Sequence, residues 1–157
     1  MRSIWIKTAV LSILLISCSY GDDLPDGWEN AVKVDGVTQS ECQDSAYDEN
    51  VIDTFSGVVN GNSIDLMYTN AHFRCSQDIE VFQIKEEDIY KFLIQPADMN
   101  PSAVAKCDCL YDISWKTEDI TTDSYVFTLH TRGDHKSGRD TPKEIATVEL
   151  SNTVAIE

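Results

Sequence analysis

The stretch Cys107-Asp-Cys-Leu-Tyr-Asp-Ile-Ser-Trp115 decides the fold of this chain. Cysteines and large apolar side chains occupy its odd positions, and mostly polar side chains occupy the even ones. Because successive side chains of a β-strand point to opposite faces, this alternation predicts a strand with one buried face. The buried face would carry Cys107, Cys109, Tyr111, Ile113 and Trp115, and the other face Asp108, Asp112 and Ser114.

The same period of two continues on both sides of this stretch. Asn60-Gly61 is a strong hairpin signal, since both residues tolerate a positive φ, and Glu86-Glu87-Asp88 is a second expected turn. No segment shows a convincing helical period. The chain is therefore predicted to be all-β, an antiparallel β-sandwich or small barrel of seven to eight strands stapled by disulfides. The other predicted strands are residues 51–59, 63–73, 79–84, 89–94, 125–129, 146–150 and 154–156.

The composition allows one domain and narrows its partners. With 157 residues, of which 42% are hydrophobic and 9% aromatic, the chain can bury a real core within a single domain of usual size. Acidic side chains outnumber basic ones by 27 to 12, for a formal charge of -15. This charge argues against non-specific binding to nucleic acid and against electrostatic adsorption to anionic lipid. It identifies no partner by itself.

Residues 1–17 have the form of a secretory signal peptide. Arg2 and Lys7 precede an apolar run at residues 8–17. That run is too short to span a hydrocarbon core, which needs about 20 residues. It ends in Leu15-Ile16-Ser17-Cys18, which resembles the lipobox of bacterial lipoproteins.

The resemblance to lipoproteins implies that the signal is cut before Cys18 and that Cys18 then carries lipid on its thiol and its new amine. Such an anchor would hold three acyl chains, two through the thiol and one on the amine. It would be permanent, because two acyl chains already suffice for stable binding. By the same analogy, Ser19 in place of aspartate after the lipidated cysteine points to the outer membrane. The alternative is ordinary cleavage after Ser19 or Gly21, which would release a secreted protein.

An acidic segment, residues 18–47, follows the signal, and we expect it to be a tether for a β-domain at residues 48–157. The mature chain would hold 27 acidic against 10 basic side chains, and residues 18–53 alone hold ten acids and one base. A segment with this charge and interspersed glycines is a poor core former, so we expect a solvated spacer. Trp28 and Val32 are its candidates for contact with the domain edge.

Four cysteines remain for the fold: Cys42, Cys75, Cys107 and Cys109. An exported protein is the setting in which disulfides form and persist. Cys107 and Cys109 share one face of their strand, and a direct bond between them would bend the backbone sharply. We therefore expect each to bond to Cys42 or Cys75. Two pairings stay open, 42–107 with 75–109 and 42–109 with 75–107.

A metal site is the main alternative for the cysteines. His72, Cys75, Cys107 and Cys109 offer four ligands of the kind that zinc or copper prefers. Their spacing is not specific, and an oxidising compartment competes for the thiols. Thiol–disulfide exchange is a further interpretation of the Cys-x-Cys pair. The sequence pattern, however, does not indicate the βαβ unit of a redox fold.

Two segments resemble a pattern in uncharacterised secreted bacterial β-domains, in which an Asn–Phe–Cys strand is joined to a cysteine-rich strand. They are Tyr68-Thr-Asn-Ala-His-Phe-Arg-Cys75 and Cys107-Asp-Cys-Leu-Tyr-Asp-Ile113. That group has no assigned activity, so the resemblance adds nothing to the prediction of function.

The loop at residues 132–142 is locally basic in an acidic chain, so we expect it to be solvated or to face an anionic ligand. It contains Arg132-Gly-Asp134, a cell-adhesion tripeptide in other proteins. No nucleophile elbow, zinc-protease helix, phosphate loop or dinucleotide motif occurs in the chain, so we expect no enzyme and no cofactor. The predicted function is a lipid-anchored cell-envelope protein with a binding or structural β-domain. Its expected partners are the membrane, through the lipid, and an unknown envelope protein or ligand, but no nucleic acid.

Overall fold

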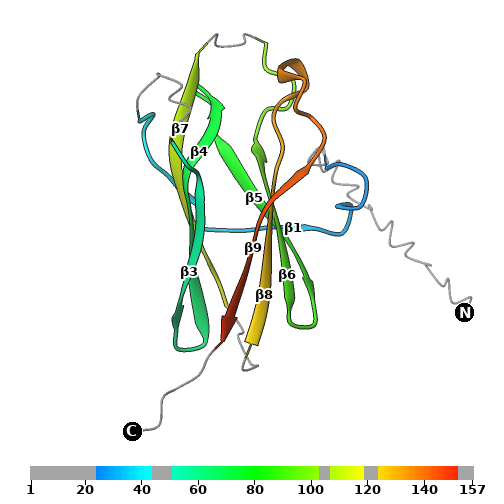
Figure 1. Ribbon diagram of the computed structural model, residues 1–157. Coiled ribbons are helices and arrows are strands. Elements are labelled where there is room, and N and C mark those ends of the chain that lie inside the picture. The colour runs from blue at the N-terminus through cyan, green and yellow to red at the C-terminus, as the bar shows by residue number, and fades with distance from the viewer. Residues whose placement is uncertain (1–23, 44–50, 103–106, 119–123, 152–157) are drawn as a thin grey trace, which may run out of the picture.

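Two β-sheets packed face to face make up the fold (Figure 1). The computed structural model describes residues 24–43, 51–102, 107–118 and 124–151. The elements in these residues are β1 (Val32–Lys33), β2 (Thr38–Gln39), β3 (Thr54–Asn60), β4 (Ser63–Arg74), β5 (Ile79–Glu86), β6 (Ile89–Pro96), β7 (Asp108–Thr117), β8 (Ser124–Thr131), the 3-10 helix η1 (His135–Ser137) and β9 (Lys143–Ser151). One sheet has the order β1-β5-β6-β8-β9 and the other β2-β7-β4-β3. The all-β sandwich is confirmed.

The two hairpins predicted from their turn residues are present. β3 pairs with β4 across the Asn60-Gly61 turn, where Gly61 has a φ of 66°. β5 pairs with β6 across a turn in which Glu87 has a φ of 55°. Glycine has no Cβ and adopts a positive φ at little cost, which is why Gly61 suits the first turn.

One pair of strands departs from the predicted antiparallel arrangement. β6 and β8 run parallel, with Tyr90 opposite Phe127 and Phe92 opposite Leu129. The chain leaves β6, forms β7 in the other sheet and then returns to β8. A long connection of this kind can set two strands side by side in the same direction, which a short hairpin cannot.

The described residues contain nine strands, more than the seven to eight predicted. The additional strands β1 and β2 come from the segment expected to be a spacer. β1 pairs with β5 and β2 pairs with β7, so this segment joins the two sheets. Residues 24–43, which the sequence assigns to the tether, thus contribute two strands to the sandwich. The predicted edge strand at 154–156 lies outside the described residues.

Trp28 fixes the N-terminal segment to the five-stranded sheet. Its side chain is only 7% exposed and packs against Phe82 and Leu93. Its ring meets that of His130 edge-on, with 5.2 Å between the centroids. The burial of His130 lowers the pKa of that imidazole below its ordinary value. Val32, the other expected contact, is 64% exposed.

A bulge in β4 sets which of its side chains face the core. The pairing with β7 shifts between Tyr68 and Ala71, and both of these residues are buried. Asn70, within the bulge, has a φ of 57°, which asparagine tolerates better than most residues. Its backbone N–H donates to Asp112 Oδ1 at 3.1 Å, and its side-chain amide donates to the Ile52 carbonyl at 2.9 Å.

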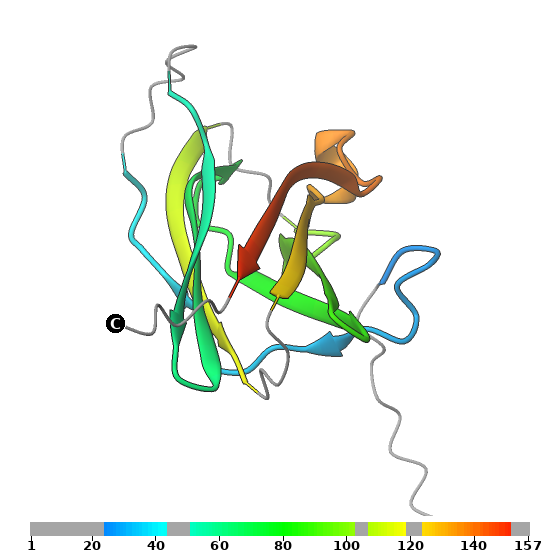
Figure 2. The same cartoon turned by 60° about the horizontal axis from the view of Figure 1, so that its bottom comes forward.

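The core lies between the two layers, which Figure 2 shows side by side. Aromatic side chains from both sheets fill it. The rings of Phe92 and Trp115 meet edge-on across the sheets at 5.2 Å, and those of Phe92 and Phe127 are stacked at 6.2 Å. The alternation of the 107–115 stretch is confirmed for its buried face at Cys109, Tyr111, Ile113 and Trp115, whereas Cys107 is exposed.

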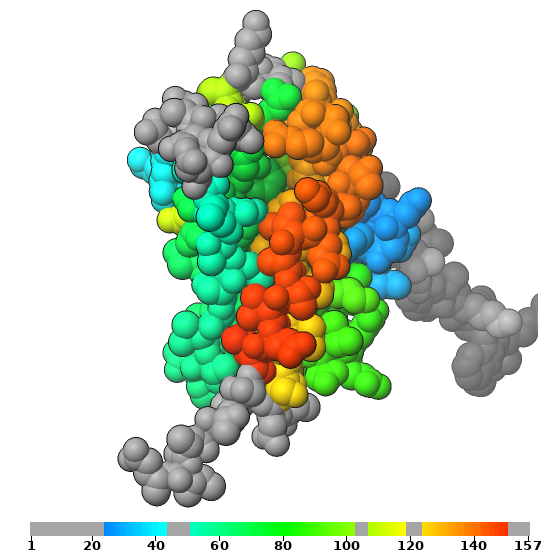
Figure 3. Space-filling view, in the orientation of Figure 1, coloured from blue at the N-terminus to red at the C-terminus, as the bar shows by residue number. Residues whose placement is uncertain are grey.

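β3 and β9, each the last strand of its sheet, meet along one side of the sandwich (Figure 3). Leu150 of β9 lies directly over Gly57 of β3. A Cβ on Gly57 would come within 2.9 Å of Leu150 Cδ1 and of Leu66 Cδ2. A side chain at this position would therefore push the ends of these two leucine side chains aside.

Candidate functional site

The four cysteines form two disulfides, Cys42 with Cys109 and Cys75 with Cys107. This is one of the two pairings that the sequence leaves open. The Cα atoms of the two pairs are 5.4 and 5.6 Å apart, within the usual range for a disulfide. The bond between Cys42 and Cys109 ties the N-terminal segment to β7. The other bond links the end of β4 to the start of β7.

His72 lies apart from the sulfur atoms. In the β4–β7 pairing His72 stands opposite Leu110, and its neighbour Phe73 stands opposite Cys109. Because neighbouring residues of a strand point to opposite faces, the imidazole of His72 and the sulfur of Cys109 project to different sides of the sheet. The described residues therefore do not gather the predicted ligand set of His72, Cys75, Cys107 and Cys109 around one point.

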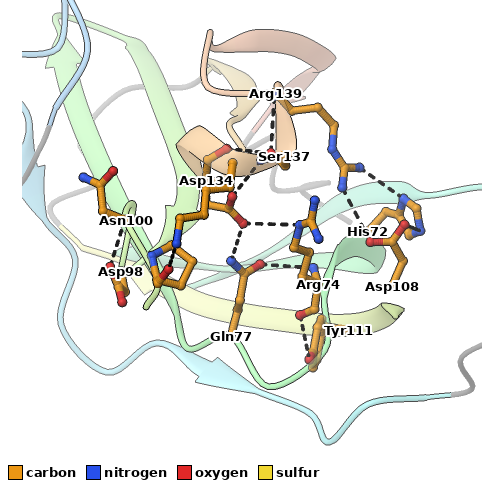
Figure 4. A network of polar contacts seen from close by, with 12 residues as sticks. His72, Arg74, Gln77, Asp98, Asn100, Asp108, Tyr111, Asp134, Ser137 and Arg139 are labelled. Carbon is orange, nitrogen blue, oxygen red and sulfur yellow. Dashed lines mark hydrogen bonds and ion pairs between the residues drawn. The ribbon is translucent and has the colours of Figure 1, made fainter. Parts of the chain in front are cut away.

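The loop between β8 and β9 is held by Asp134, whose side chain is 0% exposed (Figure 4). Its Oδ1 accepts from the Ser137 N–H at 2.8 Å and so caps η1. Its Oδ2 accepts from Gln77 Nε2 at 2.8 Å and lies 3.5 Å from Nε of Arg74. A buried carboxylate needs partners of this kind to offset the loss of water. The loop is thereby anchored to the end of β4.

Arg132 is buried beside this carboxylate network. Its Nε donates to the Asp140 carbonyl at 2.6 Å, and its Nη1 donates to the side-chain oxygen of Gln95 at 3.1 Å. Both charged side chains of Arg132-Gly-Asp134 are therefore committed to partners within the fold. The tripeptide is not displayed as an adhesion motif would have to be.

A cleft of about 260 Å³ opens between this loop and the end of β4. Figure 4 shows the labelled side chains of both walls pointing toward each other. The basic side chains of the lining are His72, Arg74, Arg139 and Lys143, and Thr131, Ser137 and Thr141 add hydroxyl groups. In a chain with a formal charge of -15, this is a local concentration of basic groups.

The rim of the cleft is a looser group of charges around Arg139. Its Nη1 lies 3.5 Å from His72 Nδ1, and its Nη2 lies 3.6 Å from Asp108 Oδ1. His72 Nε2 is in turn 3.8 Å from Asp108 Oδ2. These side chains are partly exposed, and ion pairs of this length and exposure contribute little to stability. The rim can therefore rearrange around a ligand, whereas the floor at Asp134 is fixed.

The sequence predicts the loop wall of the cleft and, in the opposite wall, only His72, as a candidate metal ligand. The basic loop was a candidate, but Arg74 and Gln77 were not. The loop itself contains one sequence pattern that could have indicated a structural role for Asp134. Asp134 and Gly138 stand where a short helix needs its N-cap and its left-handed C-cap. Gln77, the partner of Asp134 in the opposite wall, is 57 residues away in the sequence, and no local sequence pattern connects positions so far apart.

No model of a known protein family matches the chain, and the chain has no significant similarity to a curated protein or to a solved structure. No helix among the described residues is long and apolar enough to cross a bilayer.

Proposed function

We propose that this chain is a non-catalytic binding module of a cell envelope and that its ligand enters the cleft between β4 and the loop at residues 132–142. The observation that carries the proposal is the construction of the cleft. Basic side chains, among them Arg139 and Lys143, line the cleft together with the buried Asp134, which is fixed by its partners. A rigid floor lowers the entropy lost on binding.

The charges of the cleft favour an anionic group, such as a carboxylate or a phosphate. Arg74 is balanced locally by Asp134, at 3.5 Å. Arg139 pairs with the partly exposed Asp108 at 3.6 Å, and an incoming anion can compete with this weak contact for the guanidinium. Guanidinium groups bind carboxylate and phosphate with two parallel hydrogen bonds. The acidic remainder of the surface repels the same anion and leaves the cleft as the favourable place.

The Ser137 hydroxyl and the Asp134 carboxylate of the cleft serve the fold, which supports binding over nucleophilic chemistry. The Ser137 hydroxyl donates to the Asp134 carbonyl at 2.6 Å and accepts from the Arg139 N–H at 3.2 Å. A nucleophile needs a base within hydrogen-bonding reach. The histidine of the cleft, His72, contacts Arg139 and Asp108 instead.

An NMR titration of the oxidised protein with inorganic phosphate, and separately with citrate, tests this proposal. We expect saturable shifts at the amides of the cleft wall, weakened by a factor of about ten in Arg139→Ala/Lys143→Ala because a charge-assisted hydrogen bond contributes about 1.5 kcal/mol or more. The matched control is Lys91→Ala/Lys116→Ala, which removes two lysines that pair with acids elsewhere. Equal binding by both double variants, or no saturable shift with either anion, would contradict the proposal.

The place of action in this proposal is a membrane surface, reached through lipid on Cys18. Support comes from the signal-like residues 1–17 and the lipobox-like residues before Cys18, which lie outside the described residues. Two disulfides in the fold add support, since such bonds persist in exported proteins. The outer membrane is the proposed location, and a secreted form is the alternative.

Detergent-phase partitioning tests the anchor. We expect the full chain produced in a bacterium to enter the detergent phase and the Cys18→Ala variant to enter the aqueous phase. The described domain would be unaffected, so anion binding by the variant serves as the control for folding. Identical partitioning of the two proteins would refute lipidation.

A further inference from the structure

Three sulfur atoms from different parts of the chain lie together beside β7. The Sγ atoms of Cys42, Cys75 and Cys109 are all within 4.8 Å of one another. Cys75 Sγ is 3.0 Å from Cys109 Sγ, although these two cysteines belong to different disulfides. Cys107, bonded to Cys75, places a fourth sulfur at the edge of the group.

Backbone contacts that involve no sulfur hold these cysteines in place. The Cys75 N–H donates to the Cys107 carbonyl at 3.0 Å. Beside Cys42, the Gln43 N–H donates to the Leu110 carbonyl at 2.9 Å. Cys109 is inside the β4–β7 ladder and is 1% exposed. Reduction of the disulfides removes none of these contacts, so the four thiols would stay close together.

We propose that the reduced chain binds one Zn²⁺ ion through Cys42, Cys75 and Cys109, with Cys107 as the fourth ligand. Zinc takes four thiolates in a tetrahedron with bonds of about 2.3 Å, which sets neighbouring sulfurs about 3.8 Å apart. The three clustered sulfurs need only small movements to reach that spacing. His72 has no part in the site, because it projects from the other face of β4.

The change from disulfides to metal site is a balanced redox reaction. Each disulfide takes two electrons from a water-soluble phosphine and two protons from a water molecule, whose oxygen converts the phosphine to its oxide. The four thiols then release protons to the solvent as they bind zinc as thiolates. The oxidised form offers no thiolate, so zinc binding depends on the redox state. Anion binding in the cleft is measured on the oxidised protein, so its outcome is independent of the outcome for zinc binding.

Titration of the phosphine-reduced full chain with Co²⁺, under anaerobic conditions, tests the proposal, with Zn²⁺ added afterwards as competitor. We expect saturation at one equivalent, a thiolate-to-cobalt charge-transfer band, and the intense visible absorption of a tetrahedral site, all removed by zinc. Cys109→Ser should weaken cobalt affinity by more than about 100-fold, because the loss of a residue that only supports a metal ligand already costs up to about 100-fold. Cys42→Ser should weaken it strongly as well, whereas His72→Ala should leave both spectrum and affinity unchanged.

Circular dichroism of the same samples separates a missing site from a missing fold. A reduced chain that loses its β signal and regains it with one equivalent of zinc supports the proposal. A reduced chain that keeps its β signal without binding cobalt overturns it, as does an unfolded reduced chain that zinc does not restore. The proposal also fails if His72→Ala weakens binding as much as Cys42→Ser, because the ligand set would then be a different one.

Discussion

The N-terminal segment (residues 24–43) and the loop at residues 132–142 are both polar, and from the sequence both are expected to be solvated. The structure builds both into the fold by different means. The N-terminal segment is attached by Trp28, by two strands of two residues each and by the disulfide of Cys42. The loop is attached by two buried charged side chains, Arg132 and Asp134.

The difference between these attachments predicts different sensitivity to substitution. Loss of an apolar or covalent attachment removes its own contribution to stability, while the other attachments of the segment remain. Loss of a buried charge also leaves its partners buried without compensation, which adds the cost of their desolvation. We therefore expect the loop at residues 132–142 to tolerate single substitutions less well than the N-terminal segment.

The largest effect is expected at Asp134. Asp134→Ala leaves Arg74, Gln77 and the Ser137 N–H without their carboxylate, and should lower the free energy of unfolding by about 3–5 kcal/mol. Urea unfolding of the oxidised protein measures it. Asp140→Ala is the control, because that side chain is half exposed at its ion pair with His135, and its loss should cost far less than the loss of Asp134. Similar costs for the two variants would remove the distinction between buried and exposed charge.

Removal of the disulfide at the N-terminal segment should have the next largest effect. Cys42→Ala/Cys109→Ala is expected to cost about 2–4 kcal/mol. The matched variant is Cys75→Ala/Cys107→Ala. Its sequence separation is 32 residues against 67, so the chain-entropy relation makes the bond of Cys42 more stabilising by about 0.7 kcal/mol. Denaturant unfolding of both double variants gives the free energy lost with each disulfide. A larger loss for the Cys75–Cys107 bond would show that strain or packing outweighs chain entropy.

Trp28 tests the apolar attachment. Trp28→Ala should cost about 2–3 kcal/mol, the value for burying one large side chain, and should expose residues 24–31 to limited proteolysis. Val32→Ala in the same segment should stay within about 0.5 kcal/mol of the parent, because Val32 is exposed. If both variants were equally stable and equally resistant to protease, Trp28 would not be the anchor.

The smallest effect concerns pH. Burial lowers the pKa of His130 in the folded protein below the ordinary value of about 6.5, so the unfolded chain takes up this proton first as the pH falls. The contribution of His130 to stability is complete above about pH 6.5 and is lost as the pH falls from there toward the folded pKa. Urea midpoints of the parent should therefore drop more between pH 8 and pH 5.5 than those of His130→Gln. A parallel pH dependence would count against this assignment.

The strands of the core were predictable because each buried face follows from a local period of two. The partners of the strands were not predictable in the same way. The parallel pairing of β6 with β8 depends on where β7 goes, and alternation within β6 and β8 contains no information about that. Gly57 shows the same limit, since its role comes from contact with Leu150, almost a hundred residues later.

The attachment of the two polar segments to the fold could not be predicted, because a few anchors outweigh their average composition. Trp28 is one apolar residue in an acidic stretch, yet a pocket formed by Phe82 and Leu93 is enough to hold it. Asp134 has the ordinary appearance of a loop carboxylate in the sequence. Its burial depends on Gln77 and Arg74, which reach it only through the packing of the two sheets.

Amide hydrogen exchange of the oxidised protein tests most directly whether both polar segments belong to the fold. In the N-terminal segment, the N–H groups of Val34 and Ser40 donate to Val81 and Asp112. In the loop, the Gly133 N–H donates to the Arg139 carbonyl. We predict slow exchange at all three amides, comparable to that of the core strands. Exchange at the rate of an unstructured peptide in either segment would contradict the structure of that segment, and in the loop it would remove the fixed wall of the proposed binding cleft.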